Sequence, residues 1–163
     1  MRLPPVDHLP SFPNGCRPGI GIVGCGRIVR SDHLPSYRRY GQRVVGVYDP
    51  RPEATQGVRE AFGVETVFAT LEELLAHPDV EIVDVATHPA VRPELVRRAF
   101  AAGKHVLAQK PLALDVETAR DLVAEADALG LRLAVNQNGR WAPAWRAATL
   151  LVQAGVVGDV AAV

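Results

Sequence analysis

The sequence has few cysteines and no long apolar run. Cys16 and Cys25 are the only two cysteines among 163 residues, and they form neither a CxxC pair nor a disulfide framework. This usage is typical of a reducing compartment, so we expect a cytoplasmic protein. No apolar run approaches the ~18 residues that a membrane-spanning helix needs, and we therefore expect no membrane partner.

An excess of charge is also missing. The 18 basic residues balance the 18 acidic ones, which removes the electrostatic basis for binding nucleic acid or an anionic membrane. Lysine is scarce, since Lys104 and Lys110 are the only lysines among the basic residues. Arginine stays protonated near neutral pH, so a lysine in this background indicates a position where an amine is required. We expect no metal site.

A glycine-rich turn stands at the centre of the sequence pattern. The apolar run from Ile20 to Val23 ends in two closely spaced glycines and then continues in residues that favour a helix. This pattern predicts a buried strand, a tight turn and a helix. Amides at a helix start favour an anion, and after strand-Gly-x-Gly the usual anion is a dinucleotide pyrophosphate. The residues predicted to bind it are Gly24, Cys25, Gly26, Arg27 and Ile28.

Two registers of the glycine fingerprint fit the letters. The register from Gly19 to Gly24 would place the turn inside the apolar run, with no strand before it. The register from Gly24 to Val29 keeps the strand, but Val29 replaces the third glycine, which governs close packing of helix on strand. We choose the second register, while a structural turn without a ligand remains an alternative.

An acidic residue follows the next predicted strand, Arg43 to Tyr48. Asp49 lies 23 residues beyond Gly26, at the distance expected of a carboxylate that accepts hydrogen bonds from the adenosine ribose. An Asp-Pro turn at Asp49 is the alternative. Arg51 could hold the additional phosphate of NADP. We therefore expect NAD as the cofactor, with NADP possible.

Strand and helix patterns alternate along the rest of the chain. Residues 1–18 contain five prolines and are predicted to form an extended arm. Helices are expected over 27–40, in part and interrupted or bent near Pro35, and over 52–62, 91–102 and 115–129. The Thr70–Glu73 capping box predicts one further short helix. Strands are expected over 64–68, 81–86, 105–108 and 131–135. Alternation with short connections predicts an α/β fold, a Rossmann-type doubly wound parallel sheet.

Ligands of such sheets bind at the carboxyl ends of the strands. The residues predicted there, besides the glycine turn and Asp49, are Thr87, His88, Pro89, Gln109, Lys110 and Asn138. His88 could act as a base, although a histidine before proline more often shapes its loop. Lys110 is the stronger catalytic candidate because it projects from the mouth of the sheet.

Taken together, several segments resemble the Gfo/Idh/MocA family, the relatives of glucose-fructose oxidoreductase and inositol dehydrogenase. The resemblance covers roughly residues 19–163 and rests on Gly24-Cys25-Gly26-Arg27-Ile28, Asp49, Ala86-Thr87-His88-Pro89, Gly103-Lys104-His105-Val106, Gln109-Lys110-Pro111-Leu112 and Asn138-Gly139-Arg140-Trp141. It implies an NAD(P)-dependent oxidoreductase that moves hydride between the cofactor and a carbon of a sugar or polyol substrate. By this resemblance, Lys110 is the catalytic lysine of the Glu-Lys-Pro motif, and Gln109 stands where the family usually has glutamate.

The resemblance also implies a domain plan. Residues 19–140 would form the dinucleotide-binding domain, and 141–163 a linking helix and the first strand of a truncated substrate domain. The family's helical Asp-x-x-x-His pair lies in that later domain, so we regard the match of Asp84 and His88 to it as a coincidence. We expect the fragment alone to be inactive and the full-length protein to form a homo-oligomer. The alternatives are a stand-alone dinucleotide-binding sensor or regulatory module without turnover, and a Rossmann domain that has lost its ligand.

Overall fold

Five parallel strands form the centre of the fold, in the order β2-β1-β3-β4-β5. The computed structural model describes residues 15–159, so most of the predicted proline-rich arm lies outside the described residues. The strand bounds are β1 Gly19–Val23, β2 Arg43–Tyr48, β3 Ile82–Val85, β4 His105–Gln109 and β5 Leu133–Asn136. All five residues of β1 are buried, as expected of a central strand covered on both faces.

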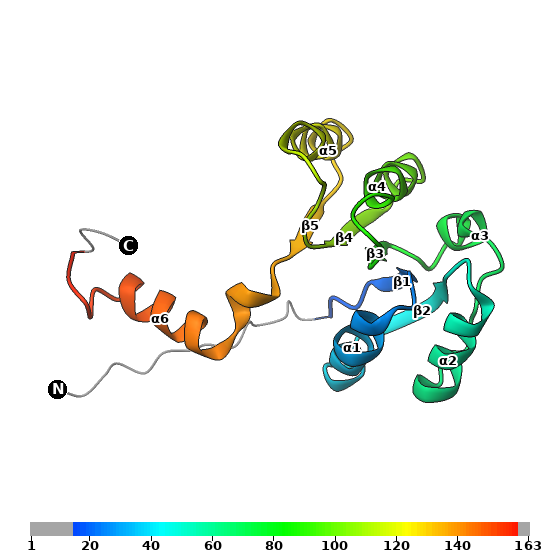
Figure 1. Ribbon diagram of the computed structural model, residues 1–163, viewed down its shortest axis with the longest axis horizontal. Helices are drawn as coiled ribbons and strands as arrows, with labels where there is room; N and C mark the ends of the chain where they lie inside the picture. Colours follow the sequence, from blue (N-terminus) through cyan, green and yellow to red (C-terminus); the bar gives the residue numbers. More distant parts are fainter. Residues whose placement is uncertain (1–14, 160–163) are drawn as a thin grey trace. The chain divides into compact units, whose positions relative to one another are not determined.

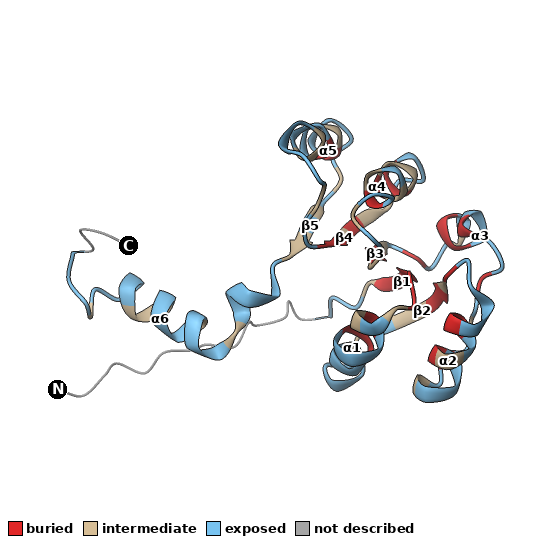
Figure 2. Cartoon of the chain, viewed as in Figure 1, coloured by how far each residue is buried: buried red, intermediate tan, exposed pale blue. Residues whose placement is uncertain are grey.

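Helices cover both faces of this sheet (Figure 1). One face carries α1 and α2, and the other carries α3, α4 and α5. The bounds are α1 Leu34–Arg39, α2 Pro52–Phe62, α3 Leu71–Ala76, α4 Arg92–Ala101 and α5 Val116–Ala128. The buried side chains form two apolar clusters, one on each face, and Figure 2 shows burial concentrated where the helices meet the strands. The prediction of a doubly wound Rossmann-type fold is confirmed.

The strand order reverses beside β1. The chain passes from β1 to β2 on one side and then crosses to β3 on the other side of β1. In sheets of this kind the crevice outside the carboxyl ends of the strands at such a switch point is the place where ligands bind. The fold therefore brings the ends of β1, β2 and β3 to one candidate site.

The strand predicted over 64–68 is not formed. Only Val67 pairs with β2, through one bridge to Val47. Val47 donates to the carbonyl of Thr66 at 3.1 Å and accepts from the amide of Phe68 at 2.9 Å, so the ladder does not extend beyond this residue. With the bridge counted as a strand, the order becomes the 3-2-1-4-5-6 order of dinucleotide-binding folds.

The helix after the glycine turn is irregular near Pro35, where an interruption or bend was predicted. It is π-wound over η1, Val29–His33, and Pro35 follows as the second residue of α1. Helical residues run without a break from 27 to 39. The widened turn begins at Val29, the residue that replaces the third glycine of the fingerprint, and it ends at His33, whose side chain is buried.

The remaining described residues, 137–159 with 15 and 16, belong to a second unit. It contains the short 3₁₀ turn η2, Asn138–Trp141, and the helix α6, Pro143–Gln153. No residue of α6 is buried, and the guanidinium of Arg146 lies 5.1 Å from the centre of the Trp141 ring. The strand predicted at the end of the chain lies largely outside the described residues. The domain boundary after residue 140 stays a prediction.

Candidate functional site

The two glycines of the turn have different surroundings. Gly24 has a φ of +98°, and a Cβ there would lie 2.8 Å from the carbonyl oxygen of Ala86. Only glycine fits this position without strain. A Cβ on Gly26 would meet no atom within 4 Å, so the space beside Gly26 is open. The turn therefore leaves its backbone accessible to a ligand on the Gly26 side.

Asp49 connects the end of β2 to the glycine turn. Its Oδ2 accepts from the amide of Cys25 at 2.8 Å, and its Oδ1 accepts from the amide of Arg51 at 3.0 Å. The guanidinium of Arg51 donates to both carboxylate oxygens, at 3.0 and 3.1 Å. Burial opposes ionisation, but these hydrogen bonds outweigh it and hold the pKa of Asp49 below its ordinary value. The carboxylate is thus charged at neutral pH and fixed in position.

The thiol of Cys25 is fully buried beside this carboxylate. Burial, and secondly the charge of Asp49, raise the pKa of the Cys25 thiol to about 12. The side chain is therefore a neutral thiol at physiological pH, and it packs with the apolar cluster under α1 and α2. The contribution of Cys25 to the turn is its backbone amide, because its thiol is neither charged nor exposed.

A cavity of about 530 Å³ lies at the carboxyl ends of β1, β2 and β3. It brings together six residues predicted from the sequence as site residues: Gly24, Gly26, Asp49, Arg51, Thr87 and His88. Its wall also contains the apolar side chains of Leu71 in α3, Leu95 in α4, and Val91 directly before α4. A concave site with an apolar wall and a few fixed polar groups is typical of cofactor binding.

Other predicted residues lie outside this cavity. Arg27 is exposed at the start of the first helix, and Ile28 packs against the cluster under α1 and α2. Pro89 is half-buried in the loop after β3. Asn138 belongs to the second unit, where its Oδ1 accepts from the amide of Gly139 at 3.1 Å.

His88 is exposed in the loop that follows β3. Its Nδ1 accepts from the amide of Ala90 at 3.3 Å, which is the contact of a residue that shapes its own loop. Its ring nevertheless lines the cavity. The structure thus supports a loop-shaping contact and leaves the other ring nitrogen available to a ligand.

The two lysines have different environments. The amide of Lys110 donates to Oε1 of Gln109 at 2.8 Å, and the side chain of Lys110 is exposed beyond the end of β4. Lys104 lies at the other end of the sheet, where its Nζ donates to the carbonyls of His77 at 3.1 Å and Val80 at 2.7 Å. Lys104 thus stabilises a turn, and Lys110 is the lysine near the strand ends.

The sequence analysis missed two buried polar groups near the site. Arg92, only 2% exposed, donates to the carbonyl oxygens of Thr87 and Pro111 and so joins the loops after β3 and β4. Asp84 is completely buried and contacts His33. A charged residue inside the otherwise apolar strand Ile82–Val85 was a signal for the second group, whereas nothing in the pattern around Arg92 indicated its burial.

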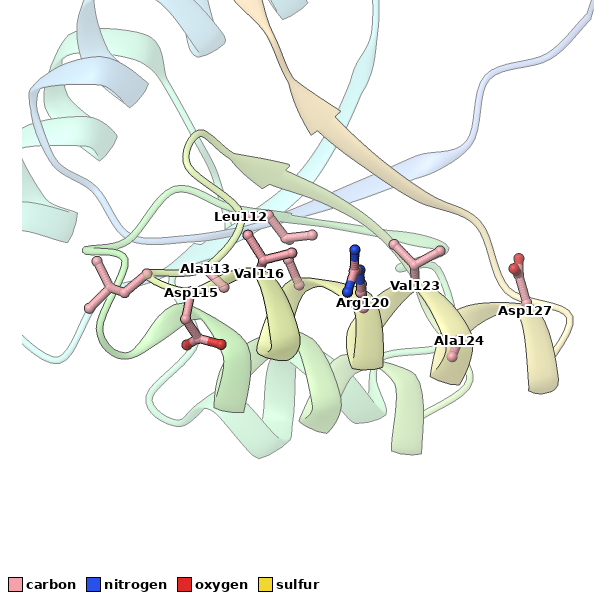
Figure 3. Close-up of a pocket in the computed structure, with 10 residues that line it drawn as sticks. Leu112, Ala113, Asp115, Val116, Arg120, Val123, Ala124 and Asp127 are labelled. Carbon is pink, nitrogen blue, oxygen red and sulfur yellow. The ribbon is translucent and has the colours of Figure 1, made fainter.

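A second hollow, of about 600 Å³, lies along the outer flank of α5 (Figure 3). Val116, Arg120, Val123 and Asp127 follow one another along the helix, with Leu112 beside the first of them. The residues that line this hollow lie between Leu112 and Asp127, so they include neither the glycine turn nor the strand ends at the switch point. We therefore assign the candidate site to the smaller cavity, where the backbone and Asp49 provide specific polar contacts.

Within 15–159, no group of three or more histidine, cysteine or acidic residues could hold a metal ion. In the same part of the chain, no helix is long and apolar enough to cross a membrane.

A parallel doubly wound sheet with a glycine turn and a fixed carboxylate at its switch point defines a dinucleotide-binding Rossmann domain. Residues 19–137 match the oxidoreductase family with an NAD-binding Rossmann fold. The chain belongs to this family, Gfo/Idh/MocA, and the resemblance inferred from its motifs is confirmed.

Individual relatives share the fold and about a third of the residues. D-apiose dehydrogenase of Paraburkholderia graminis is 33% identical over 138 residues, which cover 84% of this chain and 36% of that protein. The structure of KijD10, a 3-ketoreductase from Actinomadura kijaniata in complex with TDP-benzene and NADP, superposes with a TM-score of 0.76 at 32% identity, covering 88% of this chain and 46% of that one.

The WlbA dehydrogenase from Bordetella pertussis, in complex with NADH and UDP-GlcNAcA, superposes with a TM-score of 0.79 at 28% identity. The superposition covers 89% of this chain and 42% of the WlbA chain. The chain thus spans less than half the length of the relatives that it matches. Of these two structures, one contains NADH and the other NADP.

Proposed function

We propose that the chain is the cofactor-binding part of an oxidoreductase that transfers hydride between NAD(P) and a carbon of a sugar or polyol. The observation that carries this proposal is the cavity at the switch point, where Gly24, Gly26 and Asp49 come together. Membership of the family supports the reaction type. The sugar named in D-apiose dehydrogenase supports the substrate class. No observation favours the alternative of a sensor without turnover.

Residues of this chain fit a dinucleotide. The open space beside Gly26 and the amides of the turn suit the pyrophosphate, because a helix start favours an anion. The carboxylate of Asp49 accepts four hydrogen bonds from the protein, two of them from the exposed guanidinium of Arg51. Ribose hydroxyls would bind Asp49 in place of those two guanidinium donors. The apolar wall of the cavity suits a flat aromatic base. When bound, the nicotinamide would supply the hydride chemistry.

We propose that NAD(H) is preferred over NADP(H). A buried carboxylate would repel a 2′-phosphate, and Asp49 is charged. The guanidinium of Arg51 could attract that phosphate, but it is engaged by both oxygens of Asp49.

We further propose that Lys110 holds the proton of the substrate hydroxyl during hydride transfer. Its side chain is exposed at the carboxyl end of β4, beside the switch point. An amine can give up and take back a proton near neutral pH when its surroundings lower its pKa, which arginine cannot do. The alternative role for Lys110 is to hydrogen-bond the cofactor or the loop without proton transfer.

The rest of the functional assignment follows from the family resemblance. We propose that turnover requires a substrate-binding domain in addition to these 163 residues. We also propose that the complete protein forms a homo-oligomer and works in the cytoplasm.

Titration of the chain with NADH and NADPH, followed by nicotinamide fluorescence, tests the proposal. We expect saturable binding of both with a lower dissociation constant for NADH, and Asp49→Ala should narrow the difference. Tighter binding of NADPH would overturn the stated preference. Absence of binding at millimolar concentration would overturn the cofactor assignment itself, and dehydrogenase activity of these 163 residues alone would overturn the need for a further domain.

A further inference from the structure

A network of polar side chains is buried under the ends of β3, β4 and β5. His33, from the π-wound turn, is 6% exposed, and Asp84, from β3, is fully buried. Nδ1 of His33 lies 2.7 Å from Oδ2 of Asp84, and the hydroxyl of Tyr37 donates to the same oxygen at 2.8 Å. None of the residues assigned to the cofactor cavity takes part in these contacts.

The other ring nitrogen of His33 faces two side-chain amides. Its Nε2 lies 3.1 Å from Nδ2 of Asn136 and 3.5 Å from Nε2 of Gln109. An amide nitrogen can only donate, so Nε2 of His33 has to be the unprotonated, accepting nitrogen. The proton of the neutral ring then lies on Nδ1, where it is donated to the carboxylate of Asp84. This arrangement defines one tautomer of the ring.

Gln109 extends the arrangement to the backbone of Lys110. With its nitrogen toward His33, Gln109 places Oε1 where it accepts from the amide of Lys110 at 2.8 Å. If the Gln109 amide were turned over, its NH₂ group would face the Lys110 N–H, donor against donor. The orientation of one buried amide therefore decides whether the backbone at Lys110 keeps a hydrogen-bond partner.

We propose that His33 is a positioning residue: held by Asp84, it fixes the orientation of the Gln109 amide and through it the backbone at Lys110. The importance of this position rests on the function proposed above for Lys110. The chain of contacts itself involves no cofactor. Glutamine at this place, where the family resemblance implies glutamate, makes the orientation dependent on a neutral histidine, because a carboxylate would accept from both neighbours in either orientation.

Protonation of His33 would reverse this orientation. An imidazolium donates from both nitrogens, so the side-chain amides of Gln109 and Asn136 would have to turn their oxygens toward it. The titratable groups that face His33 are Asp84 from β3, Tyr37 from α1 and Asp32 from its own turn. Burial lowers the pKa of His33, but the hydrogen bond to Asp84 and its charge outweigh burial and raise the pKa above 6.5.

Nuclear magnetic resonance of the chain tests the proposal. The ¹⁵N shifts of the His33 ring should show the Nδ1–H tautomer at high pH. The backbone amide of Lys110 should shift with pH at the same midpoint as the His33 ring. The amide of Leu122, buried in α5 on the other face of the sheet, serves as the control and should not respond. Gln109→Glu should raise the pKa of His33 by about one unit or more, because it adds a carboxylate opposite Nε2.

Two variants separate positioning from general stabilisation. His33→Asn should abolish the response at Lys110. Gln109→Ala, which leaves the His33–Asp84 contact in place, should keep the titration of His33 and abolish the response at Lys110. In the parent chain, an Nε2–H tautomer of His33, or a Lys110 amide that does not respond while His33 titrates, would overturn the proposal. A Lys110 response that persists in Gln109→Ala would also overturn it. These measurements need no cofactor, so their failure is distinct from a failure to bind NADH.

Discussion

Gly24 and Gly26 are separated by one residue, yet only one of them is required by the backbone. A side chain at Gly26 would enter open space, which the proposal assigns to the pyrophosphate. We therefore expect Gly26→Val to abolish NADH binding while the thermal unfolding midpoint stays within a few degrees of the parent. Nicotinamide fluorescence and circular dichroism measure the two quantities. Unchanged affinity in a folded Gly26→Val protein would show that the chosen glycine register is wrong.

Gly24→Ala is the matched control for that substitution. Its Cβ would meet the carbonyl of Ala86 at 2.8 Å, and its φ of +98° is unfavourable for any residue with a side chain. We expect a loss of roughly 1–3 kcal/mol in unfolding free energy, in the range of other strained backbone positions. Chemical denaturation measures the loss. Equal stability of Gly24→Ala and the parent would contradict the tight turn.

The carboxylate of Asp49 makes the unfolding free energy depend on pH in the acidic range. Its pKa in the folded chain is below the ordinary value of 3.8, so ionised Asp49 stabilises the fold above about pH 4. This contribution is lost as the pH falls through the folded-state pKa. We expect Asp49→Asn to lose less unfolding free energy than the parent between pH 5 and pH 2, measured by urea denaturation. Parallel pH profiles of the two proteins would contradict the hydrogen-bonded state of Asp49.

The elements that the sequence predicts well are those with strong local signals. The strand over Arg43–Tyr48 and the helix started by Asp115 occur where they were predicted, because alternation, caps and glycines define their ends. The prediction of a strand over 64–68 was wrong, because a local pattern does not show how many residues can pair with the edge of β2. Pro35 indicated an irregular helix, but not that the irregularity would be a π-turn. The buried residue of that turn, His33, contacts Asp84, 51 positions away.

Arg92 joins three elements, since it extends from α4 to the loops after β3 and β4. Arg92→Met keeps most of the side-chain volume but leaves the carbonyls of Thr87 and Pro111 without their donor. Unsatisfied buried carbonyls cost about 1–3 kcal/mol each, so we expect a marked decrease in unfolding free energy by chemical denaturation. Arg98→Met is the control, because Arg98 is half-exposed and pairs with the exposed Glu72. An equal, small effect of both substitutions would contradict the bridging role of Arg92.

At the scale of the whole molecule, the family was predictable and the substrate class was not derivable from this chain alone. The family can be read from short local motifs, namely the glycine turn, Asp49 and the segment around Lys110. Substrate choice depends on side chains that meet in space. The chain matches only 36% of the length of D-apiose dehydrogenase, so more than half of that relative has no counterpart here.

The role proposed for Lys110 concerns turnover by the complete protein. In a version that oxidises a sugar or polyol, Lys110→Arg should keep NADH affinity and lose about 100-fold or more in kcat, as expected for a missing general acid or base. Lys104→Arg, at the opposite end of the sheet, is the matched control and should keep its rate. A Lys110→Arg enzyme as fast as the parent would remove Lys110 from the mechanism.

Amide chemical-shift mapping with NADH tests most directly where the cofactor binds. We expect NADH to shift the amides of Gly24, Gly26 and Arg51 at the switch point and to leave those of Val116 and Val123 on α5 unchanged. Shifts confined to the α5 hollow, or no saturable shift at the glycine turn, would contradict this expectation.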